Sequence, residues 1–172
     1  AATAVPFSGW GAGPWGLGTW GYSQTSSSAI RLWSQSNFGE DLVFAYRAGP
    51  ICYWDASTGA TVRGKVIDIT NYPASSDVPT VVNIVSVSDI FRFVFAFGTN
   101  VIGSATQDPM LIRWSNQENV FDWGVTATGT AGSLRVSHGT EIIAVVQARQ
   151  EVLVWTDSAL YSMQYLGGDI VW

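Results

Sequence analysis

Residues 141–165, EIIAVVQARQEVLVWTDSALYSMQY, decide the fold class of this chain. Two runs rich in β-branched and aromatic residues, Glu141–Ala148 and Glu151–Thr156, are separated by only two residues, a link of hairpin length. A third run of the same kind, Ala159–Tyr165, follows a short polar break. No capped helical period of 3.6 residues runs through the stretch, so it predicts three consecutive β-strands.

Strand-like runs separated by turn signals continue upstream as far as residue 30. They are expected at Ile30–Ser34, Asp41–Tyr46, Ile51–Asp55, Val62–Thr70, Val81–Val87, Phe91–Gly98, Met110–Ser115 and Ser133–Val136. Within Phe91–Gly98, four phenylalanines alternate with other residues, so all four rings are expected on one face of a strand. Residues 30–172 are therefore predicted to form an all-β domain in which helix is limited to a turn or two.

The first 29 residues have a different pattern, with a Trp-Gly pair recurring every five residues at Trp10, Trp15 and Trp20. A period of five matches neither a helix nor a strand. Residues 1–29 are therefore predicted to be a separate, irregular Gly/Trp-rich segment. The three indole rings have two interpretations: they plug gaps between sheets or against a partner chain, or they form a platform on which a sugar stacks.

Weak internal repetition runs through the β region. Three times, a hydrophobic strand precedes a second strand that ends in tryptophan, at Trp54, Trp114 and Trp155, which are 60 and 41 residues apart. Four-stranded propeller blades take roughly 40–50 residues each. The repetition predicts propeller-like blades forming a partial propeller, with the three tryptophans as structural anchors and Trp114 equivalent to Trp155 in the core. Asp157 is expected to bond backbone amides in a turn.

The composition limits which functions are plausible. Of the 172 residues, 47% are hydrophobic and only 12% charged, and 13 acids against 8 bases give a net charge of −5. Scattered arginines and a single lysine do not form the basic cluster that grips DNA. So few charges indicate either a place inside a larger assembly or a surface of uncharged polar residues. The chain has no apolar run of about 18 residues, so we expect no membrane span.

The two ends of the sequence predict a fragment. The chain begins Ala1-Ala2 without an initiator methionine or a signal peptide, and it stops on the apolar pair Val171-Trp172. We therefore expect a piece of a longer protein that does not function as a free monomer.

Residues suited to catalysis or metal binding are few. Cys52 lies in an apolar run and His138 is the one histidine, so they predict neither a zinc site nor a nucleophile–base pair. A glycosidase needs two nearby carboxyl groups. The candidates, Glu40, Asp41, Asp55, Glu118 and Asp122, mostly sit beside turns. Calcium at Asp157 would need further oxygen ligands. We expect no enzyme activity and no cofactor.

Four passages resemble a known family. They are Asp108–Asn119 (DPMLIRWSNQEN), Thr130–Arg135 (TAGSLR), Val152–Tyr165 (VLVWTDSALYSMQY) and the opening Gly9–Gly21. They are similar to tail structural proteins of tailed bacteriophages, of the nozzle, stabilisation or hub type. Such proteins usually run to several hundred residues, so a complete propeller is not expected in 172 residues.

The resemblance implies a virion protein made in the host cytoplasm, with a β-propeller that oligomerises around the DNA passage. Its partners would be other tail subunits and copies of itself, and DNA would pass by without tight binding. The family supplies no active-site residues. One alternative is a receptor- or glycan-binding module of the tail that uses Trp10, Trp15 and Trp20. A second alternative is a glycosidase-type propeller.

Overall fold

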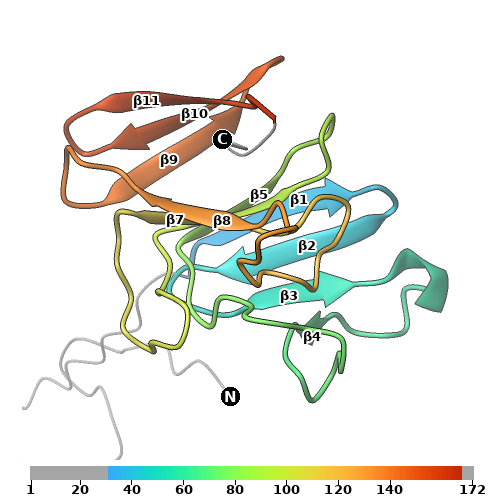
Figure 1. The fold of residues 1–172 in the computed structure, drawn as a ribbon. Helices are drawn as coiled ribbons and strands as arrows, with labels where there is room; N and C mark the ends of the chain where they lie inside the picture. Colours follow the sequence, from blue (N-terminus) through green and yellow to red (C-terminus); the bar gives the residue numbers. More distant parts are fainter. Residues whose placement is uncertain (1–30, 168–172) are drawn as a thin grey trace, which may run out of the picture. The chain divides into compact units, whose positions relative to one another are not determined.

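A computed structural model describes residues 31–167, and this part of the chain is all-β, as the sequence predicts. Its strands form three antiparallel sheets (Figure 1). Helix within the described residues is limited to one 3₁₀ turn, Ala56–Thr58, whose N-cap is Asp55. The residues from Leu32 onward form a unit of their own. The predicted Gly/Trp-rich segment, residues 1–29, lies outside the described residues.

Each sheet is built from strands that follow one another in the chain. The first sheet has the order β1 (Trp33–Phe38), β2 (Asp41–Tyr46), β3 (Ile51–Trp54), β4 (Lys65–Val66). The second has the order β5 (Ile84–Val87), β6 (Val94–Phe97), β7 (Leu111–Trp114), β8 (Gly132–Arg135). The third consists of β9 (Ile142–Gln147), β10 (Glu151–Thr156) and β11 (Leu160–Gln164), with β10 in the middle.

The second sheet lies between the other two, and its middle strands β6 and β7 are buried on both faces (Figure 1). One face of β6, with Val94 and Ala96, shares a hydrophobic core with Val43 and Ala45 of β2. Its other face shares a second core with the third sheet. That core contains Phe93, Phe95, Phe97, Ile112, Trp114, Ile142, Val152, Val154 and Met163. The alternation along β6 therefore separates the two cores, because successive side chains point to opposite faces.

The phenylalanine ladder is confirmed in part: Phe95 and Phe97 lie in β6, whereas Phe93 precedes the strand and Phe91 lies in the turn before it, where Arg92 has a φ of +54°. Phe93, Phe95 and Phe97 are fully buried in the core between the second and third sheets, and Phe91 packs against the same core. Neighbouring rings contact each other: the ring centroids of Phe93 and Phe95 are 6.5 Å apart, and those of Phe95 and Phe97 are 6.0 Å apart. These rings fill the space between two sheets that pack face to face.

Several strand boundaries differ from the sequence-based expectation. The runs expected at Val81–Val87 and Phe91–Gly98, for example, form strands only at Ile84–Val87 and Val94–Phe97. The run expected at Ile30–Ser34 forms a strand at Trp33–Phe38 instead, because it pairs with β2 across the tight turn that starts at Gly39. Gly39 has a φ of +70°, a conformation that glycine adopts without strain. In the run expected at Val62–Thr70, only Lys65 and Val66 pair with β3. Hydrophobicity alone does not reveal which residues find a neighbouring strand.

Two serines of β1 cover the open edge of β5. The backbone N–H of Val85 donates to Ser34 Oγ at 2.9 Å, and that of Val87 donates to Ser36 Oγ at 3.2 Å. Both valines are buried. Without the two hydroxyls, these N–H groups would be left without a partner inside the protein, which costs free energy. The first and second sheets are therefore joined by hydrogen bonds as well as by apolar packing.

We predict that Ser34→Ala destabilises the fold by about 1–3 kcal/mol, the cost of leaving a buried N–H unpaired. Its neighbour Gln35 is exposed, so Gln35→Ala should change the free energy of unfolding by less than about 0.5 kcal/mol. Urea unfolding followed by tryptophan fluorescence measures both variants. Equal effects of the two substitutions would contradict the role assigned to the hydroxyl.

Candidate functional site

The predicted anchor Trp114 lies in the core. Its side chain is buried between the second and third sheets, and its indole N–H donates to the carbonyl of Thr130 at 2.8 Å. Gly132 allows this ring to pack closely, since a Cβ there would come within 2.5 Å of it. Trp114 therefore fixes the loop before β8 to the body of the second sheet.

Trp54 and Trp155 are only half-buried and belong to neither core. Each lies on the outer side of an end sheet, because its strand turns the alternate residues inward. The sequence repetition is also out of phase. Trp54 and Trp114 end the third strand of their sheets, whereas Trp155 lies on the second strand to be formed in its sheet. The expected equivalence of Trp114 and Trp155 therefore does not extend to strand position or to burial.

The outer side of the first sheet, which we call the back face, is rich in aromatic residues. The strand registers place these side chains on it: Trp33, Gln35, Asn37, Leu42, Phe44, Tyr46, Cys52, Trp54 and Val66. The Trp33 ring is 59% exposed and contacts Phe44 and Tyr46, with centroids 6.1 Å and 5.6 Å away. None of these nine side chains is charged. The loop before β4 packs on part of this face: Trp54 donates to the carbonyl of Val62 at 2.9 Å, and a Cβ on Gly64 would lie 2.7 Å from the Phe44 ring. The strand positions of the back face thus form an uncharged aromatic surface that the described residues leave partly open.

The outer side of the third sheet, which we call the front face, is also largely apolar. It carries Ala144, Val146, Glu151, Leu153, Trp155, Leu160, Ser162 and Gln164. Val146 is 52% exposed and Leu160 is 55% exposed. The one charged member, Glu151, accepts hydrogen bonds from the side chains of Ser162 and Gln164. These bonds lower the pKa of the Glu151 carboxyl.

Strands β2 and β10 are apolar on both of their faces. β2 reads Leu-Val-Phe-Ala-Tyr after Asp41, and β10 reads Val-Leu-Val-Trp after Glu151. Antiparallel strands at the surface normally alternate apolar and polar residues, whereas strands covered on both sides are apolar throughout. The sequence of both strands is therefore typical of inner layers, although each belongs to an end sheet.

A polar network centred on Asn116 organises the long loop between β7 and β8. The Asn116 side-chain oxygen accepts from the backbone N–H groups of Thr130 and Ala131, at 2.6 Å and 2.8 Å. Its amide nitrogen donates to Asp122 at 2.6 Å. Asp122 also accepts from the Ser76 hydroxyl at 2.8 Å. These residues hold three loop segments together.

The Asp122 carboxyl has a pKa below its usual range. Partial burial raises this pKa, but hydrogen bonds from Ser76, Gly124 and Asn116 stabilise the charged form and outweigh burial. Asp108 behaves similarly: burial raises its pKa, while Arg135, 2.6 Å away, and the N–H of Met110 lower it. Both carboxyl groups are therefore ionised acceptors that organise the structure rather than proton donors.

His138 lies at one end of the third sheet beside two hydroxyl groups. The Ser137 Oγ is 3.0 Å from His138 Nδ1, and the Tyr161 hydroxyl is 3.2 Å from the same nitrogen. The nearby Asp157 accepts from the N–H and hydroxyl of Thr140, at 2.8 Å and 2.7 Å. These bonds lower the pKa of Asp157. Asp157 is thus engaged with Thr140, and no carboxylate among the described residues orients the imidazole as a catalytic triad requires.

The other candidate carboxylates are also tied into turns. Asp41 accepts from the Tyr53 hydroxyl at 2.5 Å and from the N–H of Ala56 at 3.0 Å. Burial and the neighbouring Asp41 raise the pKa of Tyr53, which keeps this phenol neutral. Asp55 caps the 3₁₀ turn by accepting from the N–H of Ser57 at 2.8 Å. Glu118 is exposed, in a loop with a φ of +57°.

Cys52 is half-buried on the back face, and burial raises the pKa of its thiol. No group of three or more His, Cys, Asp or Glu side chains in residues 31–167 is placed to hold a metal ion. Nor does any helix among these residues have the length and apolar character needed to cross a membrane.

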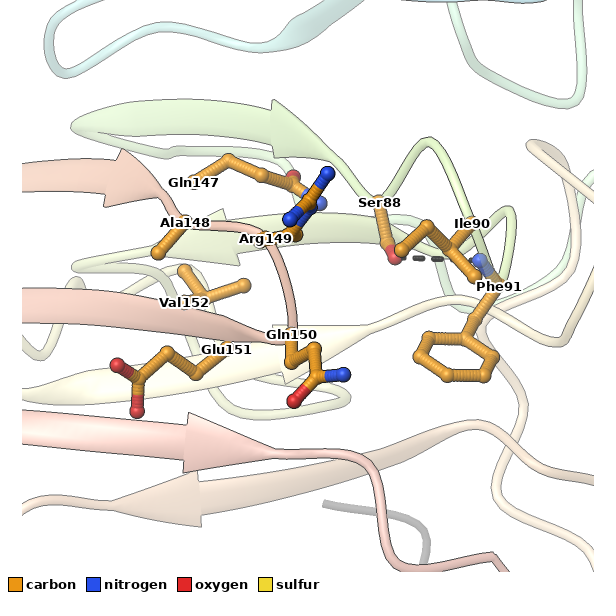
Figure 2. Close-up of a pocket in the computed structure, with 9 residues that line it drawn as sticks. All are labelled: Ser88, Ile90, Phe91, Gln147, Ala148, Arg149, Gln150, Glu151 and Val152. Carbon is orange, nitrogen blue, oxygen red and sulfur yellow. Dashed lines mark hydrogen bonds between the residues drawn. The ribbon is translucent and has the colours of Figure 1, made fainter.

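A small hollow lies where the turn after β5 meets the β9–β10 hairpin (Figure 2). Ser88, Ile90 and Phe91 line one side, and residues 147–152 line the other. Its volume is about 10 Å³, room for a single water molecule. The buried side-chain oxygen of Gln147 has no partner among the described residues, and a water there would satisfy it. The hollow is too small for a substrate.

Comparison of the chain with protein-family models, with curated proteins and with solved structures finds no match. The back and front faces are therefore the features of the described residues that invite a functional interpretation. The sequence analysis did not predict these two faces, although β2 and β10 are apolar at successive positions, which indicates that both sides of each strand are apolar. The other predicted site residues, Trp10, Trp15 and Trp20, lie outside the described residues.

We predict that Asp122→Asn lowers the free energy of unfolding by about 1–3 kcal/mol at pH 7, since it disrupts hydrogen bonds to a carboxylate. The folded-state pKa of Asp122 is lowered, so its stabilising effect is present above the unfolded-state value of about 4. That effect is lost as the pH falls through the lowered pKa. The gap between variant and native protein should therefore narrow towards pH 2.

Urea unfolding at pH 7 and at pH 2–3 measures this gap. Asp89→Asn is the matched control, because Asp89 is exposed in the turn after β5 and loses the same charge. A gap for Asp122→Asn that stays constant between the two pH values would show that the ionised carboxylate is not the stabilising group.

Proposed function

We propose that this chain is a structural assembly module of a bacteriophage tail, of the nozzle, hub or adaptor type, and that it has no enzymatic role. One observation carries the proposal: the stack of three sheets ends on both sides in faces that are built like interior layers. A protein that works alone in water gains nothing from two such faces, whereas a subunit of a permanent assembly uses them as interfaces.

The sheet arrangement supports propeller-like blades as the architecture of this module. Each sheet is an antiparallel meander, and its first strand contacts the first strand of the next sheet, β1 with β5 and β5 with β9. In a propeller, blades of this kind pack face to face with their first strands near a common axis. Three sheets would supply part of such a ring, and neighbouring protein would supply the rest.

The passage that resembles tail proteins, Asp108–Asn119, has a structural role in this chain. Trp114 fills the core, Ser115 accepts from the N–H of Val94 at 3.1 Å, and Asn116 braces the loop before β8. These contacts explain why such residues suit a rigid blade, and they need no substrate. The resemblance and the geometry thus favour the same mechanical function.

The glycosidase alternative has less support. Catalysis by two carboxyl groups requires them to flank a sugar in a cleft. In residues 31–167 the candidate carboxylates are distributed among separate turns, and none of them lines the small hollow between the turn after β5 and the β9–β10 hairpin, where the lining carboxylate is Glu151. The glycan-binding alternative rests on Trp10, Trp15 and Trp20, and it is separated from the structural function by experiment.

We predict that particles purified from the encoding phage contain this chain in several copies each, at the tail. Quantitative mass spectrometry gives the copy number, and immunogold labelling with an antibody to the chain gives the location. The chain's presence in infected cells but absence from particles would contradict the proposal.

The alternative predicts a different result. A glycan-binding module should show saturable quenching of tryptophan fluorescence on titration with host-surface polysaccharide. The structural module should show none. Replacing Trp10, Trp15 and Trp20 with alanine supplies the control, since genuine sugar stacking would disappear with the rings.

A further inference from the structure

We propose that the outer edge of β11 binds one extended segment of a different protein, which adds to the third sheet as a fourth strand. The segment that suits this edge alternates apolar with polar residues and carries a lysine or arginine on its polar side. The inference deepens the proposed function and rests on it for the presence of a neighbouring protein. It names the place where such a partner binds the chain and the conformation in which it does so.

The third sheet has one strand fewer than the other two. In the first and second sheets a fourth strand, β4 or β8, pairs with the third, whereas β11 is the last strand of its sheet among the described residues. No strand in this part of the chain therefore pairs with the second edge of β11. The backbone N–H and C=O groups along such an edge are a template on which a further strand forms hydrogen bonds.

The register of β10 and β11 identifies the backbone groups that an added strand would meet. Where β10 turns into β11, the N–H of Thr156 donates to the carbonyl of Ala159 at 2.9 Å. Hydrogen-bonded and non-hydrogen-bonded pairs alternate from that point, so β10 bonds the second and fourth residues of β11. The backbone groups that point away from β10 belong to three exposed residues, Leu160, Ser162 and Gln164.

The last strands of the other two sheets have the features that protect an edge, and β11 lacks them. β4 has only two residues, one of which is Lys65. β8 has four residues and ends in Arg135, which forms an ion pair with Asp108 at 2.6 Å. β11 is longer, with five residues, and contains no charged residue, proline or glycine. Short length and charged side chains are common means of preventing strand addition, so β11 is the end strand best suited to it.

The inner side of β11 requires apolar residues in the added strand. Met163 is buried in the core between the second and third sheets. Leu134 of β8 lies on the same side of its sheet as Ile112, which belongs to that core, yet Leu134 is 48% exposed. Residues of an added strand that point the same way as Met163 therefore face an apolar surface. Cross-strand pairs of apolar side chains stabilise a sheet.

Glu151 provides the charge complementarity on the outer side. Its carboxylate accepts hydrogen bonds from Ser162 and Gln164, so it lies close to the open edge on the front face. A lysine or arginine at the outward positions of an added strand would pair with it, since opposite charges on neighbouring strands attract. A second copy suits the edge less well. Pairing of two β11 strands would bring two Glu151 carboxylates together, and each copy has a net charge of −5.

Fluorescence anisotropy with a labelled peptide tests the inference on the full chain. The probe is a short peptide that alternates valine with threonine and lysine, and its ends are acetylated and amidated. We expect saturable binding with a Kd between about 10 µM and about 1 mM. A second peptide with glutamate in place of lysine should bind more weakly. Equal binding of the two peptides would overturn the charge complementarity assigned to Glu151.

Ser162→Pro removes the N–H in the middle of the open edge. Because this group is not bonded to β10, proline leaves the hydrogen bonds of the sheet in place, and peptide binding should weaken at least tenfold. Ser162→Ala keeps the N–H and should bind normally. Ser133→Pro is the matched control, because Ser133 is exposed in β8 and its N–H points away from β7. Circular dichroism and thermal unfolding verify that each variant is folded.

Hydrogen exchange on the native chain tests the same edge without a substitution. The backbone N–H groups of Leu160, Ser162 and Gln164 should exchange rapidly in the free chain and at least tenfold more slowly when the peptide is bound. Protection of these groups in the dilute free chain would overturn the inference, because the chain itself would then cover the edge. Protection that grows with chain concentration would overturn it in favour of a second copy.

Two further results would contradict strand addition at β11. One is the absence of peptide binding at about 1 mM, and the other is an equal loss of binding in Ser162→Pro and Ser133→Pro. All these results leave the proposed function standing, because the particle-labelling experiment decides it independently.

Discussion

Strands β6 and β7 are buried on both faces, so they must be apolar on both sides and must find every backbone hydrogen-bond partner inside the protein. β6 meets this constraint by pairing with β5 and β7, and β7 by pairing with β6 and β8. The same need applies to β5 at the edge of the sheet, where the backbone N–H groups of its two buried valines donate to the Ser34 and Ser36 hydroxyls. The first sheet is thus held to the second by the backbone needs of a buried layer as well as by hydrophobic packing.

Arg113 is the exception within this buried layer, and its surroundings show how the layer tolerates a cation. Burial lowers the pKa of the guanidinium to about 10, so it stays charged at neutral pH. It donates to the carbonyl oxygens of Asp77 and Asn100, and it lies over the Trp123 ring at 6.0 Å. Asn100 in turn accepts from the N–H of Thr80 at 3.0 Å. One buried cation thus fastens two loops to the second sheet, since breaking any contact would leave a charge unpaired.

Sequence patterns predicted the all-β class and the shared face of Phe95 and Phe97, because both depend on local alternation, which β6 displays in four consecutive residues. They extended the strand too far towards Phe91, which lies in a turn. They placed Trp155 in the core, whereas its side chain is only half-buried, because burial depends on whether another sheet covers it. Ser34, Ser36 and Asn116 were also not identified as important. Their partners are 51 residues away for each serine and 14–15 residues away for Asn116, and no local period connects residues at such separations. Periodicity identifies a strand and its faces, whereas long-range polar pairing depends on the register of whole sheets.

The outer sides of the first and third sheets are both largely apolar, so neither marks an end of the stack. Alternation in an antiparallel sheet normally ends a stack, because the polar side of the last layer prefers water to another layer. Neither β2 nor β10 has such a side, and the adjoining strands add Trp33 and Leu160 to the same surfaces. The stack therefore contains no terminating layer among its described residues. Termination must come from geometry, through closure of the sheets on themselves, or from a partner that contributes a polar outer surface. Closure covers both end faces at once, whereas a partner on one side covers only one of them.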